Sequence, residues 1–188
     1  MSAILELPSI KNRTKFLTVE AYHALGELGL ISKRTELIEG VVIQKMPKSP
    51  EHATMVLRLL RYLESVISKS LHIRSEQPIT LQRSEPEPDI SIIKGSIEDF
   101  AKAHPKRAEL VIEVSLTTLN EDREMSSIYA EANIPEYWLF NLNNNTVEVY
   151  TNPSSNRYSE MKTLSSNDSI SPKFDPNLII NLKELFIS

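Results

Sequence analysis

The sequence predicts a mixed β-sheet flanked by helices, in the α+β or mixed α/β class. Residues 109–115 and 136–141 are strand-like apolar runs separated by a helical segment, and such a unit favours a right-handed parallel crossover. The segments before residue 109 favour antiparallel pairing instead. An apolar repeat at three- and four-residue steps predicts a long core-facing helix over 50–69. Together these observations predict a mixed sheet with helices packed on it.

The chain begins with an arm and a short helix. Residues 1–17 have no clear helix or strand pattern and predict an irregular arm. Thr18 is a suitable N-cap for a helix that runs to about residue 28. Residues 36–46 are rich in Val and Ile, and they predict two strands hinged at Gly40.

The long helix and a strand follow. Ser49 and Pro50 are the preferred residue types for an N-cap and a first helical position. The apolar repeat inside the helix consists of Ala53, Val56, Leu57, Leu60, Leu63 and Ile67. Residues 72–82 predict a further strand that leads into a proline corner at 86–88.

The second half continues the sheet. Residues 121–132 predict the crossover helix, and 136–141 a buried strand. Residues 147–150 pair with that strand through an Asn-rich turn. The segment after about residue 153 is rich in turn residues, with a last apolar element at 178–187.

Composition narrows the class of protein. The 188 residues are 40% apolar, which suits a single domain over 18–188. The absence of cysteine excludes a disulfide scaffold, a zinc–thiolate site and a thiol nucleophile. A net charge of −4 argues against a generally basic nucleic-acid-coating protein. No apolar run is long enough for a membrane span, so a cytoplasmic location is expected.

Two acidic residues fall on neighbouring predicted strands. If Ile93 lies opposite Glu109, then Asp89 lies opposite Glu113, and opposed residues of an antiparallel pair share one face of the sheet. Two opposed carboxylates repel each other, and burial of a charge is costly unless it is paired. A divalent cation between them would remove both costs, so the pair predicts a metal site.

An ordered series of short motifs runs along the chain: 36–40, 47–52, Pro86-Glu-Pro-Asp89, Leu110–Ser115, and Asp122-Arg-Glu followed by Tyr129–Trp138. In this order the motifs resemble those of a bacterial restriction-endonuclease-like family of the PD-(D/E)XK nuclease superfamily. The resemblance covers roughly residues 18–150 and is specific as an ordered series, although each motif alone is weak.

The resemblance implies a restriction-endonuclease-like core in which Asp89 and Glu113 ligate Mg²⁺ or Mn²⁺, with the backbone carbonyl of Val114 as a third ligand. Hard divalent cations prefer such oxygen ligands. The resemblance also brings Glu36 and Glu39 near the metal, with only one of them expected to reach it, and we prefer Glu39. His52 would bind a phosphate or a metal-bound water, or would be a solvated capping residue.

One residue of the superfamily pattern is absent. The Lys expected two positions after Glu113 is replaced by Ser115. In this family that Lys lies on the crossover helix, where Met125 stands instead in a segment one residue shorter than usual. Three explanations stay open: a degenerate nuclease, rescue by the charge of Arg123, or an error in the sequence at this point. Gln77 is a weaker polar candidate on the strand before Asp89.

The leading hypothesis is therefore a metal-dependent endonuclease that hydrolyses DNA phosphodiester bonds with a metal-activated water. The alternative is a catalytically weakened relative that binds nucleic acid or a protein, and a purely structural domain is a third hypothesis. DNA is the expected partner, a membrane is not, and a homodimer is left open.

Overall fold

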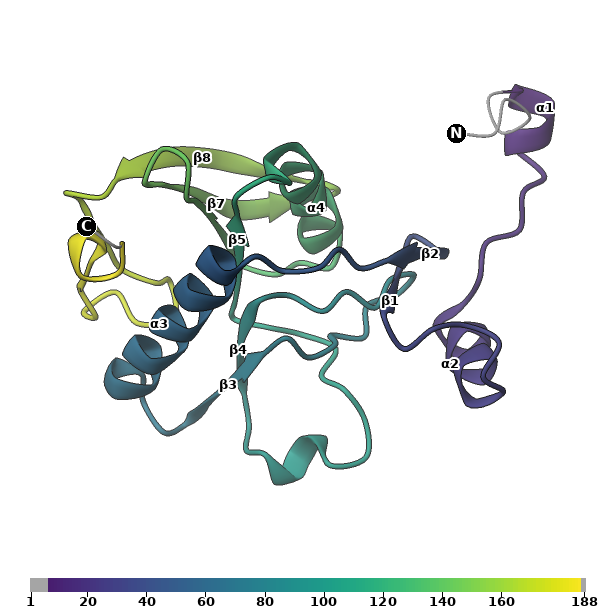
Figure 1. Ribbon diagram of the computed structural model, residues 1–188, viewed down its shortest axis with the longest axis horizontal. Helices are drawn as coiled ribbons and strands as arrows, with labels where there is room; N and C mark the ends of the chain where they lie inside the picture. Colours follow the sequence, from purple (N-terminus) through teal and green to yellow (C-terminus); the bar gives the residue numbers. More distant parts are fainter. Residues whose placement is uncertain (1–6, 187–188) are drawn as a thin grey trace.

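The computed structural model describes residues 7–186, and its centre is a six-stranded mixed sheet (Figure 1). The strands lie in the order β3-β4-β5-β6-β7-β8. Only β5 and β6 run parallel, and every other neighbouring pair is antiparallel. The strand bounds are β3 Leu71–Ser75, β4 Ile90–Lys94, β5 Leu110–Ser115, β6 Glu136–Asn141, β7 Thr146–Ser154 and β8 Arg157–Ser165. The predicted fold class, a mixed sheet flanked by helices, is confirmed.

A helix packs on each face of this sheet. Helix α3 (Pro50–Val66) contributes Met55, Leu59 and Leu63 to one core, which also contains Ile90 and Ile112 from the strands. Helix α4 (Leu119–Glu131) contributes Ile128 and Tyr129 to the other core. Because side chains alternate along a strand, odd-numbered residues of β5 face α4 and even-numbered residues face α3.

The crossover from β5 through α4 to β6 is the predicted strand–helix–strand unit. Asn133, with a φ of 56°, ends α4 in the left-handed conformation that commonly terminates helices. Helix α3 begins as predicted, because the Ser49 hydroxyl accepts a hydrogen bond from the His52 amide and Pro50 occupies the first turn.

The amino-terminal part forms a separate small hairpin beside the main sheet. Strands β1 (Thr35–Ile38) and β2 (Val41–Gln44) pair across the two residues Glu39 and Gly40, whose φ angles are 49° and 77°. Two consecutive positive φ angles are typical of the tight hairpin turn whose twist matches the strands. Helices α1 (Pro8–Lys11) and α2 (Val19–Glu27) precede the hairpin, and Figure 1 shows α1 apart from the sheet.

The remaining elements are short: a 3₁₀ turn η2 (Glu98–Phe100) between β4 and β5, strands β9 (Ser169–Ile170) and β10 (Ile180–Asn181), and a final 3₁₀ turn η3 (Leu182–Glu184). Among the residues from 7 to 186, no helix has the length and apolar character to cross a membrane. Residues 1–6 of the predicted arm and residue 187 of the last predicted element lie outside the described residues.

Two predictions about the strands were wrong. The strand predicted over 72–82 ends at Ser75, because Glu76 takes a φ of 54° and an irregular segment follows. The nine-residue strand β8 lies where only turns were predicted. Most of its side chains are exposed, so it lacks the apolar alternation that marks a half-buried strand, and only its pairing with β7 reveals it.

Candidate active site

The candidate site lies where β4 begins and β5 ends. The observed register pairs Ile90 with Ile112 and Ile92 with Leu110, as predicted. One step further along the same register, Asp89 lies opposite Glu113, and both belong to the face that carries α4. The two carboxylates therefore occupy adjacent positions at one end of the sheet.

Hydrogen bonds lock the two acidic residues together. The Asp89 amide donates to Glu113 Oε2 over 2.9 Å, and the Val114 amide donates to Asp89 Oδ2 over 2.8 Å. The Tyr129 hydroxyl on α4 donates to Glu113 Oε1 over 2.8 Å. Each carboxylate is thus held by the strand of the other, and the helix above fixes the rotation of Glu113.

Asp89 also receives two side chains from the other side of the sheet end. Lys48 Nζ lies 2.6 Å from Asp89 Oδ1, and His52 Nε2 lies 2.9 Å from Asp89 Oδ2. A carboxylate accepts hydrogen bonds, so the His52 Nε2 carries the proton in this contact. Lys48 precedes α3 directly and His52 lies in its first turn, so the start of α3 delivers both groups.

The site opens into a cavity of about 250 Å³. Six carboxylate side chains lie on its wall, namely Glu36, Glu87, Asp89, Glu113, Glu121 and Asp122. The lysines on the wall are Lys45, which pairs with Glu87, and Lys48. The charged side chains of the cavity are therefore in acidic excess, with six carboxylates against two lysines.

The environment separates the two strand carboxylates in acidity. Burial, and next the neighbouring charge of Asp89, raise the pKa of Glu113 well above its usual value. Burial opposes the ionisation of Asp89 too, but His52 and Lys48 outweigh it and leave the Asp89 pKa below its usual value. Lys48 behaves correspondingly: burial lowers its pKa, and Asp89 with Glu76 more than compensates. A charged pair Asp89–Lys48 thus lies beside a Glu113 carboxyl whose pKa is raised.

The structure brings some of the predicted site residues together and places others elsewhere. Asp89, Glu113, Val114, His52 and Glu36 all line the one cavity. Glu36 is the member of its pair that reaches the cavity, and it accepts a hydrogen bond from the Glu87 amide over 3.2 Å. Ser115, at the position of the expected Lys, is fully buried and is not among the lining residues.

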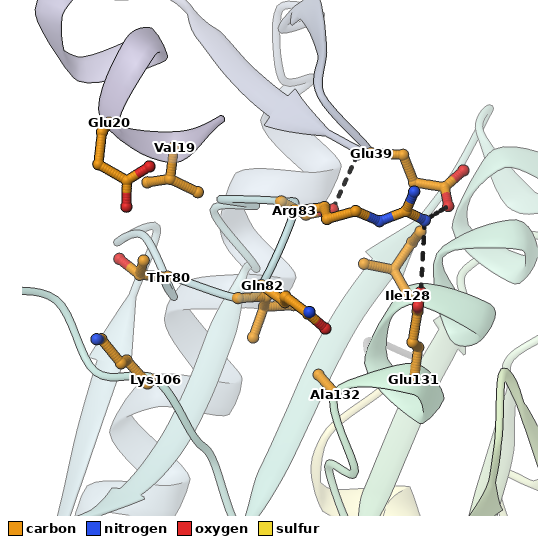
Figure 2. A pocket seen from close by; sticks show the side chains of 12 residues that line it. Val19, Glu20, Glu39, Thr80, Gln82, Arg83, Lys106, Ile128, Glu131 and Ala132 are labelled. Carbon is orange, nitrogen blue, oxygen red and sulfur yellow. Dashed lines mark hydrogen bonds and ion pairs between the residues drawn. The ribbon is translucent and has the colours of Figure 1, made fainter. Parts of the chain in front are cut away.

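Glu39 lies elsewhere, so the preference for it over Glu36 is not supported by the structure. It belongs to the hairpin turn, where its carboxylate pairs with Arg83 at 2.9 Å. Figure 2 shows this pair in a second and larger cavity, of about 400 Å³, which holds neither Asp89 nor Glu113. The reversal of the chain at Glu39 turns its side chain away from the acidic pair.

Arg123 and Gln77 are likewise placed away from the acidic cavity. The Arg123 Nε lies 3.1 Å from both carboxylate oxygens of the buried Glu148 on β7, so its charge is already engaged. Gln77 is exposed in the irregular segment that replaces the end of the predicted strand. Met125, by contrast, does line the acidic cavity, at the position where the family pattern places a Lys.

Lys48 is the residue that sequence reasoning missed. It lies 41 positions before Asp89, and nothing in the spacing of the acidic motifs points to it. One feature of the sequence could have indicated Lys48: it lies directly before Ser49 and Pro50, where α3 begins. His52, in the first turn of the same helix, was already a candidate.

A third side-chain ligand was not found. Within residues 7–186, no group of three His, Cys, Asp or Glu side chains has the arrangement to hold a metal ion. Among these residues, the two strand carboxylates therefore have no third such side chain arranged to complete a metal site with them.

Comparisons with known proteins agree with this fold. A structure titled as a putative nuclease belonging to DUF820, from Anabaena variabilis, has a TM-score of 0.71 at 20% identity, covering 90% of this chain and 97% of that one. No curated protein matches the sequence significantly. The model of the Uma2 family, described as a putative restriction endonuclease, matches residues 19–183. The resemblance predicted from the motifs is confirmed, and the chain belongs to the Uma2 family of putative restriction endonucleases.

Proposed function

We propose that this protein is a metal-dependent endonuclease that hydrolyses DNA phosphodiester bonds. The observation that carries the proposal is the pairing of Asp89 with Glu113, two carboxylates locked side by side at the mouth of an acidic cavity. Members of restriction-endonuclease-like families generally use divalent metal ions, and Mg²⁺ or Mn²⁺ is the proposed cofactor here.

The donor set suits such an ion. Asp89 and Glu113 offer hard oxygen ligands, which Mg²⁺ and Mn²⁺ prefer. The carbonyl of Val114 is the proposed third ligand: the register continues to place Val114 opposite Pro88, which has no N–H to donate to it. The Val114 amide donates to Asp89 Oδ2, and the N–H and C=O of a strand residue point to the same neighbouring strand, so we expect this carbonyl on the side of Asp89 as well.

A bound divalent ion would activate a water molecule and neutralise charge that develops on the scissile phosphate. The chain contributes orientation. His52 and the Val114 amide hold Asp89 Oδ2, while Tyr129 and the Asp89 amide hold Glu113. Side chains fixed in this way need no rearrangement when the ion binds.

Charge also supports a metal requirement for DNA binding. The net charge is −4 and the cavity wall carries more carboxylates than lysines, so a polyanionic substrate is repelled until cations neutralise the carboxylates. We therefore expect both DNA binding at this cavity and DNA cleavage to depend on the divalent ion.

The test is cleavage of supercoiled plasmid DNA with Mg²⁺ or Mn²⁺, compared with Asp89→Ala and with Glu148→Gln. Glu148 is a matched control because it is a buried carboxylate of the same sheet outside the cavity. We expect nicked and linear products from the wild type and Glu148→Gln, and none from Asp89→Ala. Binding of Mn²⁺ without any cleavage would favour the alternative function of a nucleic-acid- or protein-binding module.

A further inference from the structure

We propose that Lys48 supplies, from the segment before α3, the fixed positive charge next to the reacting phosphate. This inference rests on the proposed function, and it names a residue for the role that Met125 cannot fill. Lys48 would be a catalytic residue that contacts a phosphate oxygen of the substrate, rather than a ligand of the metal.

The position of Lys48 is the first support. Its Nζ lies 2.6 Å from Asp89 Oδ1 and 2.7 Å from Glu76 Oε1, on the wall of the acidic cavity. The following residue, Ser49, caps α3, so the backbone that carries Lys48 is fixed at the helix start. The ammonium group is therefore held at the acidic pair before any substrate arrives.

The other nearby cations are already neutralised by protein carboxylates outside the acidic pair. Lys45 on the same wall pairs with Glu87, and Arg123 on α4 holds the buried Glu148. Among the described residues of the cavity wall, Lys48 is the cation that contacts one of the two proposed metal ligands.

The contacts of Lys48 can be exchanged for a phosphate. Its side chain is 37% exposed, and its second partner, Glu76, is 50% exposed, so the ammonium group is reachable from solvent. Once a divalent ion shares the charge of Asp89, the attraction between Asp89 and Lys48 weakens, and an arriving phosphate oxygen offers the ammonium group a new anionic partner.

Met125 provides a positional test of the role. It lines the same cavity, but it belongs to α4, whereas Lys48 comes from the segment before α3. A Lys at position 125 would therefore enter the same space from the element that carries it in the family pattern. Substitutions can therefore move the lysine charge from the segment before α3 to α4 while the proposed metal ligands, Asp89 and Glu113, stay unchanged.

The experiment compares the full-length wild type with Lys48→Met, with Lys48→Met/Met125→Lys, and with Lys94→Met. Lys94 is the matched control, because it pairs with Glu109 at 3.1 Å and lies 75% exposed outside the cavity. Three quantities are measured: plasmid cleavage with Mn²⁺, Mn²⁺ affinity by calorimetry, and the salt dependence of binding to a duplex oligonucleotide in Ca²⁺.

We expect Lys48→Met to slow cleavage on the order of 10²-fold, the cost of one preorganised charge stabiliser, without weakening Mn²⁺ binding. The double variant should recover at least about tenfold of that loss, whereas Lys94→Met should cleave like the wild type. Loss of one phosphate contact should lower the slope of log K against log salt by about 1 in Lys48→Met alone.

Two results would overturn the inference. The first is cleavage by Lys48→Met at the wild-type rate or faster, which would make Lys48 dispensable or a competitor of the metal. The second is an unchanged salt slope, which decides against the phosphate contact even if the wild type does not cleave. Absence of cleavage in the wild type, with metal binding intact, would count against the proposed function instead.

Discussion

Two acidic side chains of the same sheet, Glu113 on β5 and Glu148 on β7, differ in how their buried carboxyl groups are compensated. Glu148 is held by the guanidinium of Arg123 and by the Tyr150 hydroxyl, 2.6 Å from its Oε2. Glu113 faces the carboxylate of Asp89 and receives only an amide and a tyrosine hydroxyl. Burial alone would raise the pKa of both. Hydrogen bonds from Arg123 and Tyr150 outweigh burial at Glu148, so the pKa of Glu148 falls below its usual value. At Glu113 the charge of Asp89 acts in the same direction as burial and raises the pKa further.

The difference separates a structural carboxylate from a functional one. The charge of Glu148 is neutralised within the protein by its ion pair with Arg123, so no bound cation is required there. Glu113 shares its site with a second carboxylate, Asp89, whose paired ammonium group, on Lys48, is also exposed to solvent. An arrangement that leaves like charges together stabilises the fold poorly and suits a bound cation, as perturbed acidic groups in clefts often do.

The largest expected effect is on cleavage. Glu113→Gln should lower the rate of plasmid cleavage on the order of 10³-fold or more, because it replaces a carboxylate ligand of the proposed metal site by a neutral amide. Glu148→Gln should retain most of the activity. Equal losses in the two variants, measured at equal folded fraction by circular dichroism, would erase the distinction between the two carboxylates.

The converse effect is on stability. Arg123→Met leaves Glu148 buried without its cation, and loss of one partner of a fully buried pair costs roughly 3–5 kcal/mol. Because the Arg123 side chain is 45% exposed, we expect a smaller loss of about 1–2 kcal/mol in the free energy of unfolding by urea. Mn²⁺ affinity should not change, and a large decrease would show that Arg123 serves the metal site after all.

The pH dependence of stability should identify Glu148. The Glu148 pKa is lower in the folded protein than the usual Glu value of about 4.5, so below that pH the unfolded chain binds more protons than the folded one. Stability therefore decreases as the pH is lowered through this range. The contribution is fully present above about pH 4.5 and is lost as the pH falls through the lowered value. As the pH is lowered through this range, the urea midpoint of Glu148→Gln should decrease less steeply than that of the wild type. An equally steep decrease in both proteins would contradict the assignment of this pH dependence to Glu148.

The smallest effect is expected at Glu39. Glu39→Gln removes an exposed ion pair with Arg83, and such pairs contribute about 0–1 kcal/mol. Because Glu39 faces the other cavity, cleavage and Mn²⁺ affinity should both equal those of the wild type. Calorimetry that shows weaker Mn²⁺ binding in this variant would restore Glu39 to the metal shell.

The sequence was sufficient where local pattern determines structure. The β-branched runs around Asp89 and Glu113 predicted their register, and Ser49 with Pro50 predicted the start of α3. Strand β8 could not be predicted in the same way, since a strand whose side chains are mostly exposed carries no alternation of apolar residues.

The site was harder to predict wherever tertiary contacts decide it. Whether Glu36 or Glu39 reaches the cavity depends on a turn with two positive φ angles, and both residues fit the same motif. The partner of Arg123 is set by the packing of α4 over β7. Lys48 approaches Asp89 only because the start of α3 meets the end of the sheet, which no spacing within the acidic motifs reveals.

The most direct test of the central claim, that Asp89 and Glu113 form a divalent-metal site, is calorimetric titration of Mn²⁺ into three forms of the protein. These are the wild type, Glu113→Gln, and the matched control Glu148→Gln, all at one pH and salt concentration. The account predicts a saturable Mn²⁺ site in the wild type and in Glu148→Gln that is lost in Glu113→Gln. Equal Mn²⁺ binding by Glu113→Gln and the wild type would contradict it.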